Sequence, residues 1–395
     1  MTPQSQKRIH SRVAFLAVFF TALCAGSAAR KKLPKKGKAS VHVERFFQQG
    51  HEKYGKEQTV KADNYDKFIN AQHNGTEDLS FSNYRGSSFG TDGPRRVKSV
   101  SRLYLVLFLL LILAGSTLQT LYFEVGVVIT QLVLILLPAV IFLRLHHRLN
   151  RDFTRLKAFP LRQAPFLVII MISSLVLVLG YGVVLGIFLE RMGWSIPEFL
   201  PPPQTLEILL LYFFLIALLP GICEEVLFRG TIMPLLEPQG LLTALFFSSM
   251  LFALFHLSLI RLPGTFILGF VIGLVVLKTG SLPAGMFMHV LNNGVAVTFM
   301  YFAAAAPQQL EHEVAAQSGY LFLLLLPLAA AGLYFGVKKL GGPPVLRPRQ
   351  NLLPRGWFNL ALLLSLLLFL LMAFLEVLIL SGAFDHLLRI FLNAQ

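Results

Sequence analysis

The sequence has few charged residues and almost no cysteine. Only 14% of its 395 residues are Asp, Glu, Lys or Arg, whereas 55% are hydrophobic. Ordinary soluble domains carry about 25% charged residues, so this chain is too apolar to fold in water alone. Cys24 and Cys223 both lie in apolar runs and lack a Cys-x-x-Cys spacing, which excludes a disulfide framework and a thiolate metal site. The chain is therefore predicted to be an integral membrane protein.

Apolar runs long enough to cross a bilayer, or nearly so, recur along the chain. They lie at 103–123, 125–143, 164–189, 206–223, 241–257, 262–277, 282–304, 319–337 and 357–380. A spanning helix needs about 20 mainly apolar residues. The runs therefore predict an all-α, polytopic transmembrane helical bundle of about nine spans. Because 241–257 and 262–277 are short, we expect tilted or partly irregular helices there.

The formal net charge of +15 would suggest nucleic-acid binding in a soluble protein. Here the Lys and Arg residues gather before the first span, after the second and after the eighth, and few lie on the opposite side. The tendency of basic loops to stay in the cytoplasm explains this distribution. We therefore expect the bilayer as a partner and no nucleic acid. The predicted location is a bacterial inner (cytoplasmic) membrane, with the N-terminal region in the cytoplasm.

Residues 1–102 form a basic region that differs from the rest of the chain. The apolar stretch 13–29 follows several basic residues and imitates a signal peptide, although more basic residues come directly after it. Cleavage and a short membrane-associated helix both remain open. The rest of the region is expected to be mostly disordered and to touch anionic lipid headgroups. The other predicted regions are accessory transmembrane helices (103–204), a core that carries the polar motifs (205–304), and C-terminal transmembrane helices with a short tail (305–395).

The first of three polar motifs is Glu224-Glu225-Val226-Leu227-Phe228-Arg229. An ionisable side chain within a span costs roughly 2.5–3.5 kcal/mol, so each needs a partner or a function. Glu225 and Arg229 are four residues apart and can pair on one helical face. Glu224 is turned about 100° away from Glu225, which leaves it free to act as a base. A solvated cap at the membrane interface is the alternative interpretation.

The second and third motifs are Phe252-Ala253-Leu254-Phe255-His256 and His289-Val290-Leu291-Asn292-Asn293. Taken alone, His256 is more typical of a hydrogen-bonded core histidine. His289 and Asn293 share a helical face and can donate hydrogen bonds to a common point, although bonding between helices is the usual role of such a pair. Together the three motifs supply a base, an imidazole and oxyanion donors in separate apolar runs, and packing alone does not explain that combination.

These motifs, in this order, resemble those of the CPBP (CAAX protease and bacteriocin-processing, or Abi) family of intramembrane glutamic endopeptidases. The resemblance covers roughly residues 205–300, which would then form a CPBP/Abi-like catalytic core around a cavity at membrane depth. It implies that Glu224 and His256 bind and deprotonate a water that attacks a peptide carbonyl. It also implies that His289 and Asn293 donate hydrogen bonds to the oxyanion.

By the same resemblance, Glu225 and Arg229 would form a structural ion pair that holds the first helix of the core. The implied activity is metal-independent hydrolysis of a peptide bond in a membrane-associated peptide or lipidated protein, for example a prenylated CAAX-type protein. No cofactor is expected. Zinc is a weaker alternative, because two histidines and a glutamate could complete a His₂Glu site, but the chain lacks a His-Glu-x-x-His helix.

Two other functions remain open. A non-enzymatic scaffold or a bacteriocin self-immunity protein could carry the same cluster, since proteins of this resemblance are also linked to immunity. A proton-coupled transporter could use buried carboxylates and histidines as a relay. The lack of a visible internal repeat makes the transporter the weaker of the two.

Overall fold

The computed structural model describes residues 93–194, 201–305, 308–342 and 356–383, and each regular element within them is helical. The all-α prediction is thereby confirmed for these ranges. The expectations for residues 13–29 and for a disordered basic region up to residue 92 concern residues that lie outside the described ranges. Residues 93–102, which are predicted to belong to the same basic region, are helical instead, because they continue the helix of the first apolar run. The elements are α3 (Gly93–Leu110), η2 (Leu111–Gly115), α4 (Ser116–Leu121), α5 (Phe123–Ile129), η3 (Thr130–Leu136), α6 (Leu137–Leu145), η4 (Leu161–Gln163), α7 (Ala164–Arg191), α8 (Leu206–Tyr212), η5 (Phe213–Leu218), α9 (Leu219–Leu227), η6 (Phe228–Ile232), α10 (Met233–Leu236), η7 (Glu237–Gln239), α11 (Leu241–Leu254), α12 (Leu262–Thr279), α13 (Leu282–Ala305), α14 (Gln308–Leu340) and α15 (Leu360–Leu380).

Every predicted apolar run coincides with helical structure. Within the described ranges, six stretches are long and apolar enough to cross a membrane: Pro94–Leu121, Phe123–Leu145, Leu161–Arg191, Leu206–Gln239, Leu262–Thr279 and Leu360–Leu380. The run at 241–257 forms the shorter helix α11 of 14 residues, in line with its expected shortness. A polytopic helical membrane protein fits these observations, and the count of nine spans stays a prediction.

Several of the long helices change pitch along their length. The elements η2, η3, η5 and η6 are π-helical turns inserted between α-helical segments. Such turns are rare and occur frequently at functional sites. Three of them, η3, η5 and η6, lie beside or within the helix that carries the first polar motif, because α9 contacts all three. The irregular backbone is therefore concentrated around that motif.

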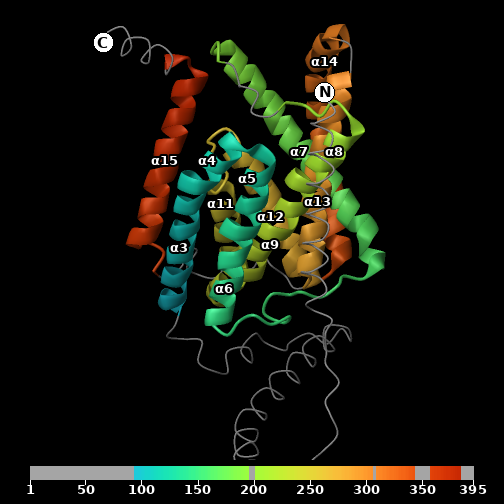
Figure 1. Ribbon diagram of the computed structural model, residues 1–395. Coiled ribbons are helices and arrows are strands. Elements are labelled where there is room, and N and C mark those ends of the chain that lie inside the picture. Colours follow the sequence, from blue (N-terminus) through green and yellow to red (C-terminus); the bar gives the residue numbers. More distant parts are fainter. Residues whose placement is uncertain (1–92, 195–200, 306–307, 343–355, 384–395) are drawn as a thin grey trace, which may run out of the picture. The chain divides into compact units, whose positions relative to one another are not determined.

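The polar motifs lie on helices that pack directly on one another. Helix α9 packs against α13 and η3, whereas α12 packs against α11, α13 and α7. Figure 1 shows α15 alongside α3 and α14 alongside α7, in agreement with the packing of these pairs. Buried aromatic side chains fill the space between α9 and α11, where Phe228 packs edge to face against Phe252 and Phe255.

The turn between α11 and α12 is held by a carboxylate from the last described helix. Glu376 of α15 accepts hydrogen bonds from the Ser258 hydroxyl and the Leu259 backbone N–H, both at 2.5 Å. The turn begins with His256, and Leu257 has a φ of +54°, in the left-handed region. Glu376 therefore holds the turn that precedes α12 from a distant part of the sequence, and the Ser258 hydroxyl oxygen accepts from the backbone N–H of the N-cap residue Arg261.

Candidate active site

Glu225 and Arg229 form an ion pair that is fully buried. Arg229 Nη1 donates to Glu225 Oε1 over 2.8 Å, and both side chains are 0% exposed. Arg229 Nη2 also donates to the backbone carbonyl of Gly269 on α12, again at 2.8 Å. The predicted pairing of this i, i+4 couple is therefore present, and it links α9 and η6 to the neighbouring helix.

The burial of the Arg229 guanidinium depends on its close neighbours. Its central carbon lies 4.4 Å from the centroid of the Phe252 ring, a cation–π contact. Gly269 allows this close approach, because a Cβ atom there would lie 2.8 Å from Phe252 Cδ1 and 3.2 Å from Arg229 Nη2. Glycine is thus required at position 269 by the space that the guanidinium and the ring occupy.

His289 joins the buried pair from α13. Its Nδ1 lies 2.9 Å from Glu225 Oε1, the oxygen that also accepts from Arg229, and the residue is 2% exposed. An ionised carboxylate can only accept, so Nδ1 carries the proton. The ring nitrogen available to a substrate is then Nε2. The sequence motif suggested that His289 acts beside Asn293, and the structure adds this link to Glu225, which the spacing did not predict.

His256 lies just after α11 and makes a local hydrogen bond. Its Nδ1 is 2.9 Å from the carbonyl oxygen of Phe252. Because a carbonyl only accepts, Nδ1 carries the proton here as well, and Nε2 of the neutral ring is an acceptor. The Phe252 ring contacts both imidazoles edge to face, with centroids 4.9 Å from that of His256 and 5.7 Å from that of His289.

Asn293 contacts a backbone carbonyl that a proline has left free. Its Nδ2 donates to the Ile216 carbonyl over 2.9 Å. In a regular helix that carbonyl would accept from the N–H of residue 220, but Pro220 has none. The Asn293 Oδ1 accepts from Asn292 Nδ2 at 3.0 Å. One N–H of the Asn293 amide therefore remains for another acceptor.

Glu224 has surroundings very different from those of Glu225. Gln131 Nε2, from η3, donates to Glu224 Oε1 over 2.9 Å. No Lys or Arg in the described ranges forms a salt bridge with Glu224, although the residue is only 8% exposed. Gln131 was not singled out from the sequence. Its signal is that, apart from Thr130, it is the only polar side chain in the apolar run 125–143.

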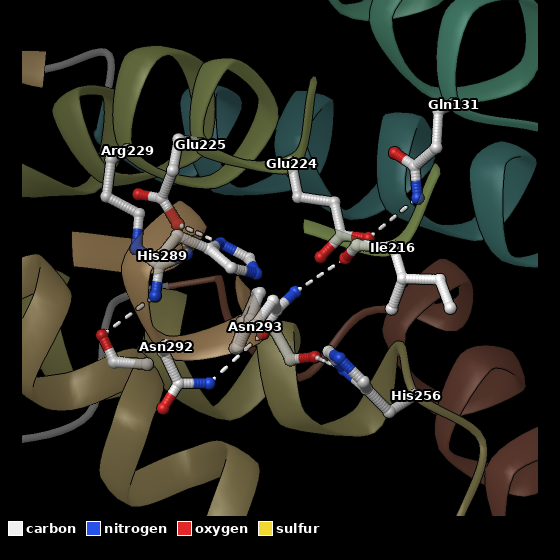
Figure 2. A network of polar contacts seen from close by, with 11 residues as sticks. Gln131, Ile216, Glu224, Glu225, Arg229, His256, His289, Asn292 and Asn293 are labelled. Atoms are coloured by element: carbon white, nitrogen blue, oxygen red, sulfur yellow. Dashed lines mark hydrogen bonds and ion pairs between the residues drawn. The ribbon is translucent and has the colours of Figure 1, made fainter. Parts of the chain in front are cut away.

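The predicted site residues come together in one region. Figure 2 shows the Glu224 carboxylate, the Asn293 amide and the His256 ring turned toward a shared space, with His289 joined to Glu225 at its edge. His256 lies within electrostatic range of both Glu224 and His289. A carboxylate, a neutral imidazole acceptor and a spare amide donor therefore gather at membrane depth, which suits proton transfer from a water.

Among the described residues, no group of three or more His, Cys, Asp or Glu side chains is placed to hold a metal ion. The Nδ1 atoms of His256 and His289 both bond to oxygen acceptors, so Nε2 is the nitrogen that each ring leaves available. The expectation of no cofactor and the zinc alternative both stay predictions.

An apolar cavity lies next to the polar cluster. Its volume is about 530 Å³, within the usual range for a ligand pocket. Val290 and Gly294, which line it, directly follow His289 and Asn293 on α13. The full lining is Phe213, Phe287, Val290, Leu291, Gly294, Val295, Thr298, Phe299 and Phe302. Apart from the Thr298 hydroxyl, these side chains are apolar, so the cavity suits a hydrocarbon group.

Comparison with known proteins gives one family. Residues 206–295 match the sequence model of the family described as "Type II CAAX prenyl endopeptidase Rce1-like". This range contains all three polar motifs, and the match confirms the resemblance to CAAX proteases inferred from them. It covers about a quarter of the chain, and Gln131 lies outside it. No curated protein and no solved structure matches this chain.

Proposed function

We propose that this protein is a metal-independent intramembrane endopeptidase that uses water activated by Glu224 and His256 to cleave a membrane-associated protein. The substrate class that fits best is a prenylated CAAX-type C-terminus. The observation that carries the proposal is the contrast between two adjacent glutamates. Glu225 is neutralised by Arg229, whereas Glu224 has an amide partner, lies near His256 and faces the shared space.

The protonation of His256 supports its role beside the base. With Nδ1–H bonded to the Phe252 carbonyl, Nε2 accepts a hydrogen bond from the nucleophilic water and orients it. Glu224 takes the proton of that water as its oxygen attacks the peptide carbonyl carbon. When the C–N bond breaks, the same proton passes to the leaving nitrogen, so Glu224 ends the cycle as a carboxylate.

Two donors are available for the oxyanion that forms. Asn293 keeps one N–H after its bond to the Ile216 carbonyl. When both ring nitrogens of His289 carry a proton, Nδ1 donates to Glu225 and Nε2 can donate to the oxyanion. Donors aimed at a developing oxyanion contribute about 3–4 kcal/mol each in other hydrolases. The apolar cavity beside α13 would hold the isoprenoid chain and thereby place the peptide at Glu224.

The test is cleavage of a farnesylated peptide ending in Cys-aliphatic-aliphatic-X by the purified full-length protein in detergent, with the released tripeptide measured by mass spectrometry. Glu224→Gln should lower kcat by at least about 10²-fold, because it removes the base while keeping the side-chain shape. The KM for a non-farnesylated peptide should be higher than that for the farnesylated one, and a chelator should not change the rate of cleavage.

Three results would count against the proposal. Full activity in Glu224→Gln would remove the base from the mechanism. Loss of activity with chelator, restored by zinc, would favour metal catalysis. Absence of cleavage by the wild type, with the folded state verified, would favour the scaffold or transporter alternatives.

A further inference from the structure

Gln131 is a buried polar side chain in an otherwise apolar helix. It lies near the start of the π-helical turn η3, within the apolar stretch Phe123–Leu145, and is 7% exposed. It belongs to the accessory helices that precede the matched segment 206–295. Its Nε2 donates to Glu224 Oε1 over 2.9 Å across 93 residues of sequence, so a helix outside the matched segment contacts the proposed base.

Only the nitrogen end of the Gln131 amide is hydrogen-bonded. Its Oε1 is buried and has no hydrogen-bond partner. An amide away from water is costly unless both polar ends are bonded. A glutamine that served packing alone would be expected to satisfy both ends or to be replaced by leucine. The one bond that it makes is to the proposed base, which indicates a role connected with that carboxylate.

The direction of the hydrogen bond determines what it does. An ionised carboxylate only accepts, so the amide N–H₂ group must face Glu224. A donor at Oε1 fixes the rotation of the carboxylate and leaves Oε2 for the nucleophilic water. The donor thus orients the carboxylate without adding a second charge to the site.

The backbone that carries Gln131 is itself fixed. Helix α9 packs against η3, and the preceding residue, Thr130, is buried and accepts a hydrogen bond from Gln119 Nε2 at 3.0 Å. We propose that Gln131 is a positioning residue that holds the Glu224 carboxylate aimed at the water. The accessory helices therefore contribute directly to the site. The inference rests on the proposed role of Glu224.

The first test is kinetic and uses the farnesylated peptide described above. Gln131→Met keeps an unbranched side chain of similar size but removes the donor. It should lower kcat by about tenfold or more, as expected for one hydrogen bond to a charged group, while KM stays unchanged. Gln163→Met is the matched control, since it makes the same chemical change at a glutamine on η4 whose Oε1 is likewise buried and without a hydrogen-bond partner. Its kcat should equal that of the wild type.

The second test does not need a substrate. A hydrophobic carbodiimide reacts with carboxyl groups in membrane proteins, and mass spectrometry locates the adduct at Glu224. Gln131→Met frees Glu224 Oε1 from its hydrogen bond and should raise the labelling rate of Glu224 severalfold, whereas Gln163→Met should leave it unchanged. If Gln131→Met does not fold, judged by size-exclusion profile and unfolding midpoint, Gln131→Leu takes its place.

The outcomes separate this inference from the proposed function. An unchanged labelling rate overturns the positioning role, whatever the peptide assay gives. Wild-type kcat in the Gln131 variant, with normal cleavage by the wild-type protein, overturns it as well. If the wild type cleaves no peptide, the proposed function fails, while raised labelling in the variant still supports control of the Glu224 carboxylate by Gln131.

Discussion

The buried Glu225–Arg229 pair allows a prediction of stability from the contacts alone. Glu225→Gln preserves the side-chain shape and leaves an oxygen that can accept from Arg229, but it removes the negative charge. The guanidinium, at 0% exposure, then has no counter-charge within the pair. Removing one partner of a buried ion pair typically costs about 3–5 kcal/mol. We expect a loss of this size in the free energy of unfolding.

A second ion pair in the same chain provides the control. Arg155 and Glu237 form a bidentate pair at 2.7 and 2.6 Å, but their side chains are 20% and 18% exposed. Water reaches this pair, so the guanidinium that is left without its counter-charge there is partly solvated. Glu237→Gln is the same chemical change as Glu225→Gln and should therefore cost less.

The unfolding assay can use a natural probe. Cys223 is buried at 1% exposure, one residue before Glu224. In a Cys24→Ser background, a maleimide that fluoresces on reaction with thiols reports the opening of α9 alone. The free energy comes from titration with sodium dodecyl sulfate in mixed micelles. Equal losses for Glu225→Gln and Glu237→Gln would refute the reasoning from burial. A double variant, Glu225→Gln with Arg229→Met, should recover part of the stability because no unpaired charge remains.

Two further predictions concern the backbone near the site. Gly269→Ala should lower the free energy of unfolding by about 1–3 kcal/mol, the usual cost of overpacking, because its Cβ would press on the buried Phe252 ring and the Arg229 guanidinium. Gly182→Ala is the control, because a Cβ there meets nothing within 4 Å, and it should be neutral or slightly stabilising. Equal effects of the two substitutions in the thiol assay would contradict this prediction. Pro220→Ala restores a backbone N–H that competes with Asn293 for the Ile216 carbonyl. The kcat for the farnesylated peptide should therefore fall by about two- to tenfold, as expected for the loss of one neutral hydrogen bond. An unchanged kcat would show that this contact does not position Asn293.

Helical periodicity predicted much of this arrangement. The i, i+4 spacing of Glu225 and Arg229 indicated their pairing, and the apolar runs indicated the helices. Periodicity assigns residues to a face of their own helix, but it does not say which distant face they meet. The contact between His289 and Glu225 depends on how α13 packs against α9, and no spacing encodes that.

Other features escaped prediction because their signals are single residues. Gln131 is one amide in a long apolar run, and its partner lies 93 residues away. Pro220 could have revealed the free Ile216 carbonyl, since a missing N–H is readable from sequence, but not its acceptance of Asn293. Helix α3 is also already helical at Gly93, the first residue of the described ranges and ten residues before the predicted run at 103, because basic side chains are tolerated at a helix end near the membrane surface.

The Phe252 ring touches three polar side chains of the site. Arg229 lies over its face, and His256 and His289 lie against it edge to face. A change of ring size would displace all three together, although they come from different helices. A substitution at Phe252 is therefore expected to require compensating changes at several of these positions at once. A descendant that abandoned this chemistry would be expected to lose the set as a block.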